Sequence, residues 1–507
     1  MRTSTSREGD LAVGALVRST SLGVPLEPTE ADIRRMYERA EDWEFSPVTR
    51  ERMLQINDLT QAFFAEKFTN SWGRDYLASR FGLDLNGHEH FRPGQAPAGW
   101  TNLVDHLRRH GVTDTEMLTT GVATTASTGR LIDRFRDRIT FPITNNGTEI
   151  LGFVGRRHPE LTEADKAGPK YLNTANNPLF HKGDQLFGLV EELVEDGAVP
   201  VIVEGPMDAI AVTLASAGRY VGVASLGTSL TDEQATQLAA VGRDPVVATD
   251  ADLAGQVAAE RDFWMLTPHG LDPGYAQFPT NMDPAELLTL RGPAELVASL
   301  ASATPLGDLL LAERLDNLPP EQARLAAITV VAARPSDSWD NGTSRVQARL
   351  ALSQLRARRE LRNAVRTWNA DPRRAAANEL ADSNKVRARL AAAANGPADR
   401  WAPLANELDP RLTAQPDWPT TATILQEAHD QGHDVTTAVS ALLAEQPLGE
   451  QPARDLRYRL VSHLDITIDT PEISNHVPTS SPTSAGAARD RQQPTRIRRT
   501  PDPGRRR

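Results

Sequence analysis

Five carboxylates stand at or just after the ends of short apolar runs in this 507-residue chain. Glu204 follows the run VPVIV, and Asp208 lies four residues further on. Asp250 and Asp252 follow the run PVVAT, and Asp283 comes after the segment DPGYAQFP. Carboxylates that converge repel one another, and some would hold a proton unless a cation lay between them. The pattern therefore predicts a site for a divalent cation.

The composition narrows the identity of that cation. The chain has no Cys, which excludes disulfides, thiolate zinc sites and iron–sulfur clusters. The eleven His are scattered and form no recognisable metal-binding pattern. A metal held mainly by oxygen is most often Mg²⁺ or Mn²⁺, so we expect one of these and no zinc. One or two such ions can activate a terminal hydroxyl and stabilise a phosphorus centre under attack.

Strands that alternate with helices must position these carboxylates. Between residues 198 and 292, the runs VPVIV, YVGVAS, PVVAT and DPGYAQFP are each followed by a helical segment. This alternation indicates a parallel sheet covered on both faces, with functional groups at the carboxyl ends of its strands. A single Asp at such a place is usually only a helix cap, and Asp208 or Asp252 could each be one.

The rest of the chain is predicted to surround this α/β domain with α+β and helical regions. The expected parts are a flexible arm at 1–48, a mixed α+β basic subdomain at 49–195, the α/β domain at 196–295, a helical subdomain at 300–370, an Ala-rich helical region at 371–464 and a disordered Arg-rich tail at 465–507. Strands at 139–143 and 150–156 flank Asn145–Asn146–Gly147, a strong hairpin signal.

Arginines on this hairpin form a second candidate group. Alternation predicts that Arg134, Arg136 and Arg138 share one strand face. A basic face beside an acidic metal pocket suits a polyanion held across both. The alternative is a solvated face neutralised by Asp133 and Asp137. The net charge of −12 argues against nucleic acid as a partner of the whole surface, but a local basic groove can exist on an acidic protein.

Several motifs resemble a known family. Glu204–Gly205 with Asp208, the stretch ASLGTS (224–229), and Asp250-Ala-Asp252 with Gly255 resemble the Toprim domain of bacterial DnaG-type primases. RFRDRITFPI (134–143), GFVGR (152–156), PKYLNT (169–174) and FHKGDQLFGL (180–189) are similar to the basic subdomain that precedes Toprim there. The resemblance covers roughly residues 50 to 355. It implies a Toprim-type parallel sheet flanked by helices, and Mg²⁺- or Mn²⁺-dependent synthesis of short RNA primers on single-stranded DNA from ribonucleoside triphosphates.

The resemblance also implies roles for individual residues. The metal-binding positions of the family correspond to Glu204, Asp250, Asp252 and Asp283, with Asp208 beside them as a further catalytic carboxylate. Basic positions that face the nucleoside triphosphate or the template backbone correspond to Arg138, Arg156, Lys170 and Lys182.

Three features depart from the family. Without Cys, the zinc-binding domain that usually begins the family is absent or supplied by another protein. Ala285 stands where the family often has a second Asp, and Glu286 could substitute for it. The C-terminal part does not resemble the family's helicase-binding domain. It is loosely similar to the Ala-rich tails of actinobacterial plasmid-transfer proteins, so a helicase or a conjugation protein is a candidate partner and a mobile element a candidate origin.

Two other functions compete with primer synthesis. A Toprim nuclease would share the metal site, but the basic subdomain and the lack of a P-loop favour a primase. A non-catalytic DNA-binding or scaffold protein would suit Ala285 and the missing zinc domain, whereas Glu204, Asp250 and Asp252 speak against it. No stretch approaches the roughly 20 apolar residues of a membrane span, and no signal segment begins the chain. A cytoplasmic protein without membrane contact is therefore expected.

Overall fold

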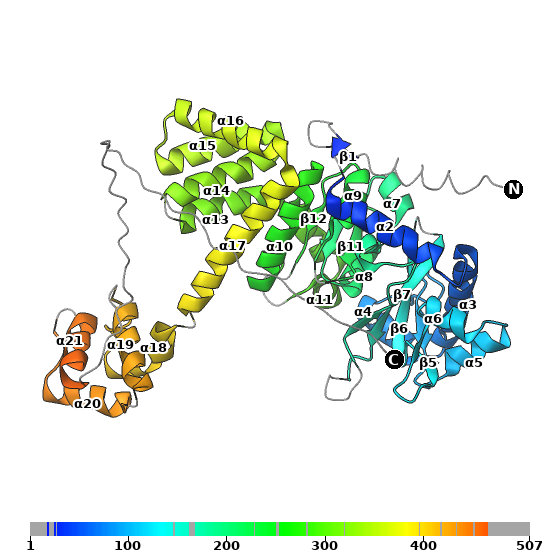
Figure 1. Ribbon diagram of the computed structural model, residues 1–507, viewed down its shortest axis with the longest axis horizontal. Coiled ribbons are helices and arrows are strands. Elements are labelled where there is room, and N and C mark those ends of the chain that lie inside the picture. Colours follow the sequence, from blue (N-terminus) through cyan, green and yellow to red (C-terminus); the bar gives the residue numbers. More distant parts are fainter. Residues whose placement is uncertain are drawn as a thin grey trace, which may run out of the picture. The chain divides into compact units, whose positions relative to one another are not determined.

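The chain forms two compact units, Met1–Val386 and Arg387–Arg507, in a computed structural model (Figure 1). The structure describes residues 18–19, 25–26, 28–145, 148–161, 168–227, 229–249, 253–279, 282–318, 320–394, 396–415, 418–431, 433–449 and 452–464. The predicted tail at 465–507 lies outside these residues, whereas the predicted arm at 1–48 is described in part and contains a helix. Two short strands, β1 (Arg18–Ser19) and β2 (Pro25–Leu26), and the helix α2 (Glu30–Glu44) precede the first large sheet.

That sheet belongs to an α+β subdomain. Its four antiparallel strands run in the order β3 (Gly94–Ala96), β6 (Arg138–Asn145), β7 (Glu149–Arg157) and β8 (Tyr171–Asn173). The accompanying elements are α3 (Arg50–Phe68), α4 (Trp72–Phe81), α5 (Asn102–Arg109), α6 (Asp114–Thr119), β4 (Ala123–Thr125) and β5 (Leu131–Asp133). Phe64 of α3 meets Phe153 of β7 edge-on, with ring centroids 5.6 Å apart, which anchors the helix on the sheet. The predicted hairpin is confirmed in β6 and β7, while Asn146 and Gly147 of its turn lie outside the described residues.

The expected row of three arginines on one strand face is wrong. β6 begins only at Arg138, and residues 134–137 connect β5 to it. Arg134 instead donates to the Asn173 carbonyl at 2.8 Å, and the Arg136 guanidinium stacks over the Trp100 ring at 4.6 Å. Strand alternation does not apply to a connection, so the three side chains diverge.

The two aspartates expected to neutralise that face have other partners. The buried carboxylate of Asp133 accepts from the backbone N–H groups of Leu103 and Val104, both at 2.9 Å, and so caps α5. Burial nevertheless raises the pKa of Asp133 to about 6. Asp137 accepts from the indole N–H of Trp72 at 2.8 Å. Both carboxylates hold the subdomain together rather than screen a solvated face.

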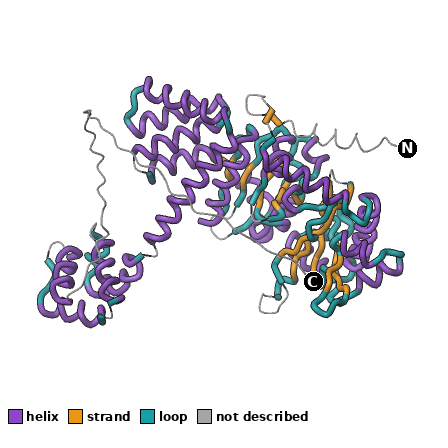
Figure 2. The backbone as a smooth tube through the Cα atoms, in the orientation of Figure 1, coloured by secondary structure: helices purple, strands orange, loops and turns teal. Residues whose placement is uncertain are grey.

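The second sheet confirms the predicted parallel α/β domain. Figure 2 shows the strands in orange among purple helices. The six strands of this sheet run in the order β14 (Thr304–Pro305), β13 (Gly274–Tyr275), β12 (Val246–Val247), β10 (Val199–Val203), β11 (Tyr220–Ser225) and β9 (Leu186–Phe187). The four central strands are parallel, and the two edge strands are antiparallel to their neighbours. Both edge strands come from outside residues 196–295, where the sequence predicted no strand of this sheet.

Helices cover both faces of this sheet. The helices are α8 (Pro206–Ala215), α9 (Asp232–Ala240), α10 (Leu253–Leu266), α11 (Pro284–Arg291) and α12 (Pro293–Ala301). Along β10, Val201 and Val203 enter the core that contains α8, α11 and α12, whereas Ile202 enters the core that contains α9 and α10. This alternation along one strand is the signature of a sheet buried on both sides. Short helices α7 (Glu191–Glu195), η2 (Lys182–Asp184) and η3 (Thr267–His269) fill connections.

Helices complete the first unit. They are α13 (Leu306–Asn317), α14 (Pro320–Ala333), η4 (Ser336–Ser338), α15 (Trp339–Leu350), α16 (Gln354–Ala370) and α17 (Pro372–Ala394), and their apolar residues share a core with α9 and α10. The second unit has its own core, built by α18 (Pro397–Leu408), α19 (Trp418–Asp430), α20 (Val435–Glu445) and α21 (Pro452–Leu464). Among the helices that the structure describes, none is long and apolar enough to cross a membrane.

Candidate active site

The carboxyl edge of the parallel sheet carries the first predicted ligand. Glu204 directly follows the buried end of β10 and is exposed to solvent. The neighbouring strand β12 leaves the sheet at the same edge, because the Ala248 N–H donates to the Ile202 carbonyl at 2.8 Å. Asp250 and Asp252 lie outside the described residues. The Thr249 hydroxyl donates to the Gly255 carbonyl at 2.9 Å, so the described chain on either side of them meets at this edge.

Two further predicted carboxylates meet beside it. Asp208, in the first turn of α8, accepts a hydrogen bond from the Ala285 N–H at 3.3 Å. Asp283 is the N-cap of α11 and accepts from the Glu286 N–H at 2.6 Å. The partial positive charge at both helix N-termini stabilises carboxylates there. Asp208 thus contacts the N-terminus of the helix that Asp283 caps. Among the described residues, Glu204, Asp208 and Asp283 do not by themselves form a group close enough to share one ion.

The geometry also supports a simpler role for Asp283, that of a helix N-cap. Its N–H and side chain form a reciprocal capping box with Glu286, which was the proposed substitute ligand. The Arg80 guanidinium of α4 lies 3.5 Å from the Asp283 carboxylate. Ala285, where the family often has Asp, is fully buried. Capping of α11 and ligation of a metal are therefore separable roles for Asp283.

A tyrosine that sequence reasoning missed joins the basic subdomain to these carboxylates. Arg156 donates to the hydroxyl oxygens of Tyr171 and Tyr76, both at 2.8 Å. A Cβ placed on Gly205, the N-cap of α8, would lie 3.5 Å from the Tyr171 ring and from the Asp208 carboxylate. Burial raises the pKa of Tyr171 to about 12, with the Asp208 charge adding to the effect. Tyr171 therefore links Arg156 to the region of Gly205 and Asp208.

The other predicted basic residues differ in exposure. Lys170 is exposed and lies 5.7 Å from the Tyr171 ring centroid, and Lys182 is exposed on η2. Arg138 is only 3% exposed and donates to the carbonyls of Gly155 and Pro169 at 3.1 and 2.9 Å. Burial lowers the pKa of Arg138 to about 10. In this geometry Arg138 holds the segment that presents Lys170, while Lys170 itself is accessible to a phosphate.

Asp262 is a further carboxylate that the sequence analysis did not single out. It lies on α10, is 6% exposed, and has its pKa raised to about 7 by burial, with the Glu204 charge adding to the shift. Helical spacing in the sequence could have predicted that Asp262 is buried. It falls three residues after Ala259 and four before Leu266, on the apolar stripe of the helix.

Another acidic group is unsuited to a metal. Asp32, Asp232 and Glu233 lie close enough to share an ion. However, Arg373 bonds Asp32 and Asp232, both at 2.7 Å, and Arg35 pairs with Glu233 at 2.6 Å. Each of the three carboxylates is therefore already paired with a guanidinium group.

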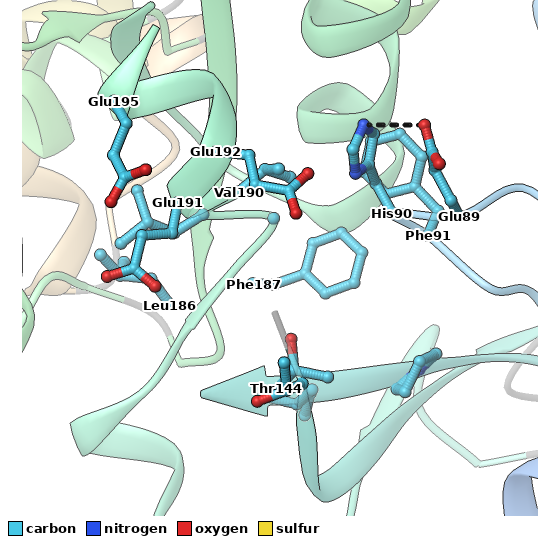
Figure 3. A pocket seen from close by; sticks show the side chains of 15 residues that line it. Glu89, His90, Phe91, Thr144, Leu186, Phe187, Val190, Glu191, Glu192 and Glu195 are labelled. Carbon is cyan, nitrogen blue, oxygen red and sulfur yellow. Dashed lines mark ion pairs between the residues drawn. The ribbon is translucent and has the colours of Figure 1, made fainter. Parts of the chain in front are cut away.

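A separate cavity has a volume of about 300 Å³ (Figure 3). It is lined by the apolar residues Phe91 and Phe187 and by the acidic side chains of α7, Glu191, Glu192 and Glu195. None of the predicted site residues lines it. Its negative charge would repel a triphosphate, so we do not assign it to nucleotide binding.

A parallel sheet with carboxylates at its strand ends, preceded by a basic α+β subdomain, defines a Toprim-type class of protein. Comparison with family models places the chain more narrowly. Residues 63–192 match the DNA primase catalytic core, N-terminal domain, and residues 201–288 match a Toprim-like domain. The chain therefore carries the catalytic core of the DnaG-type DNA primases.

Individual relatives agree with this placement. The DNA primase of Escherichia coli K12 is 32% identical over 294 residues, which are 55% of this chain and 49% of that protein. The DNA primase of Streptomyces coelicolor is 32% identical over 300 residues, 57% of this chain and 44% of the relative. The chain thus spans about half the length of the curated relatives it matches.

Solved structures match the same core. The RNA polymerase domain of the Mycobacterium tuberculosis primase DnaG is 28% identical, with a TM-score of 0.51, over 59% of this chain and 99% of that one. A DnaG primase catalytic domain bound to single-stranded DNA is 28% identical, with a TM-score of 0.52, over 60% of this chain and 97% of that one.

Proposed function

We propose that this chain synthesises short RNA primers on single-stranded DNA by metal-dependent nucleotidyl transfer. The observation that supports the proposal is the hydrogen bond from the Ala285 N–H to Asp208, at the N-terminus of the helix that Asp283 caps. Tyr171, whose hydroxyl binds Arg156, lies next to Gly205 and Asp208. These contacts lie in a chain that carries both the primase core domain and the Toprim domain.

The donors fit Mg²⁺ or Mn²⁺. All of them are carboxylate oxygens, Glu204 is exposed, and Asp208 and Asp283 are partly exposed, which suits a hard cation that keeps some of its water. Asp250 and Asp252, which follow β12 in the sequence and lie outside the described residues, would complete the ligand set. When bound, the ion neutralises the triphosphate and lowers the pKa of the primer 3′-hydroxyl.

The basic residues would hold the two polyanions. The Arg156 guanidinium is fixed by two tyrosine hydroxyls, so it offers a pre-oriented donor to a phosphate. Lys170 and Lys182 are exposed and would bind phosphates of the ribonucleoside triphosphate or of the template. No protein nucleophile is required, since the 3′-hydroxyl attacks the α-phosphorus and pyrophosphate leaves.

The test is primer synthesis on single-stranded DNA with labelled ribonucleotides and Mg²⁺ or Mn²⁺. We expect products from the wild type, and a loss of at least 100-fold, on the order of a removed transition-state contact, for Glu204→Gln and Asp250→Ala. Glu195→Gln, an exposed change on α7, is the control and should retain full synthesis. Absence of products from the wild type, even when a primer is supplied, would contradict the proposal. Cleavage of DNA by the wild type but not by Asp250→Ala would then establish a nuclease.

A further inference from the structure

The helix α16 carries a row of arginines that the carboxylate site does not use. Arg358, Arg362 and Arg366 follow one another at four-residue intervals, and Arg359 lies beside them. All four are exposed. None of them forms an ion pair with any residue that the structure describes. Residues four apart lie on one face of a helix, about 6 Å apart along its axis.

The opposite face of α16 fixes the direction of this row. Ala357 and Trp368 are buried in the core shared with the α/β domain, and Leu361 and Ala364 pack against it. These positions follow the helical period of three and four residues. The arginine row therefore points to solvent and cannot turn inward without breaking the core.

The unpaired state of the row is unusual within its own subdomain. Neighbouring arginines have carboxylate partners: Arg324 and Arg356 with Glu360, at 2.8 and 3.0 Å, and Arg349 with Asp316, at 3.2 Å. In a chain of net charge −12, carboxylates are abundant. Four adjacent unpaired guanidinium groups repel one another, a cost that an external polyanion would remove.

We infer that the Arg358–Arg366 face of α16 is a docking surface for the phosphate backbone of single-stranded DNA. A line of evenly spaced cations on a rigid helix fits a linear polyanion, and guanidinium groups bind phosphates through paired hydrogen bonds. The surface lies outside residues 63–192 and 201–288, which match the family models. The choice of single-stranded DNA as the polyanion rests on the proposed function. The surface would hold template in addition to Lys170 and Lys182.

The test compares two double variants that remove the same charge from the same subdomain. Arg358→Gln with Arg362→Gln removes two unpaired arginines, and Arg349→Gln with Arg356→Gln removes two ion-paired ones. Binding of a labelled single-stranded oligonucleotide is measured by fluorescence anisotropy against salt concentration. We expect the first pair to weaken binding about tenfold at 0.1 M salt. It should also reduce the salt slope, the slope of log K against log salt concentration, by about 1.4, because each of the two lost phosphate contacts contributes about 0.7. The control pair should leave the slope unchanged, and Arg358→Lys with Arg362→Lys should retain the slope.

The readout is independent of catalysis. Glu204→Gln should lose synthesis yet bind DNA as the wild type does, so failure of the proposed function and failure of this surface are distinguishable. Circular dichroism and the unfolding temperature of each variant report whether it has folded. Equal weakening by both double variants, or by neither, would overturn the inference. Binding of the face to anionic phospholipid vesicles without any effect on DNA would overturn it as well.

Discussion

Asp283 illustrates how two roles proposed for one carboxylate can be separated at the scale of a residue. It caps α11, the helix whose N-terminal Ala285 N–H donates to Asp208, and it is also a proposed metal ligand. Asn keeps the capping oxygen but removes the charge, whereas Ala removes both. We therefore expect Asp283→Asn to unfold at nearly the wild-type temperature, and Asp283→Ala to lose about 1 kcal/mol of unfolding free energy.

Primer synthesis should respond differently from stability. If Asp283 binds the metal, both variants lose synthesis, although only the Ala variant is destabilised. Thermal unfolding and ribonucleotide incorporation, measured on the same preparations, separate the two roles. Full synthesis by Asp283→Asn would show that the residue is only a helix cap.

The sequence predicted some site residues better than others, for physical reasons. Strand ends at one edge of a parallel sheet lie near one another, so the local pattern was enough to place Glu204 after β10 and Asp208 in the first turn of α8. The burial of Arg138 could not be predicted in this way, because the side chain bonds the Gly155 carbonyl on the partner strand β7 and the Pro169 carbonyl just before β8. The contact of Tyr171 with Gly205 likewise joins two subdomains, and no local spacing encodes it.

At the scale of elements, a buried polar network joins α10, α13 and α17. Arg314 of α13 pairs with the buried Glu260 of α10, and the Ser383 hydroxyl of α17 donates to Glu260 at 2.7 Å. This network explains why the predicted boundary at residue 371 does not coincide with a break in packing: α17 begins there and still packs into the first unit, which ends at Val386. Alanine-rich composition indicated a helix but not its partners.

The same network predicts how stability depends on pH. Burial raises the pKa of Glu379 on α17 from its ordinary 4.5 to about 7, and Arg314 and Thr329 offset this only in part. Below pH 4.5 both folded and unfolded chains hold this proton, so the group contributes nothing. Between pH 4.5 and 7 the unfolded chain ionises first, which lowers the unfolding free energy by up to about 3 kcal/mol.

Glu379→Gln should abolish this loss. We expect its unfolding temperature to exceed that of the wild type by about 4 °C at pH 8 and to equal it near pH 4.5. Glu41→Gln, an exposed change on α2, should show no such difference between the two pH values. Equal unfolding temperatures of Glu379→Gln and the wild type at pH 8 would refute the proposed burial cost.

At the scale of the whole molecule, the hydrophobic cores follow the division into two units. The core that α16 and α17 share with the α/β domain has Leu380 as its last described member. The core of the second unit is drawn from residues 398–460. The sequence indicated helices in both regions, but amphipathic helices alone do not reveal which ones pack together. That depends on tertiary contacts between segments far apart in the chain.

Separate cores predict that the first unit folds without the second. A chain ending after Ala394 keeps all of α17 and every described member of the first unit's cores, so its unfolding temperature should lie within about 2 °C of the first unit's transition in the full chain. Because Arg358, Arg359, Arg362 and Arg366 remain, its salt slope for single-stranded DNA should also be unchanged. Differential scanning calorimetry measures the unfolding temperature, and the anisotropy titration measures the salt slope.

A fall in unfolding temperature with an unchanged salt slope would show that residues 395–507 stabilise the first unit without binding DNA. A reduced slope with unchanged stability would instead place part of the DNA contact in those residues.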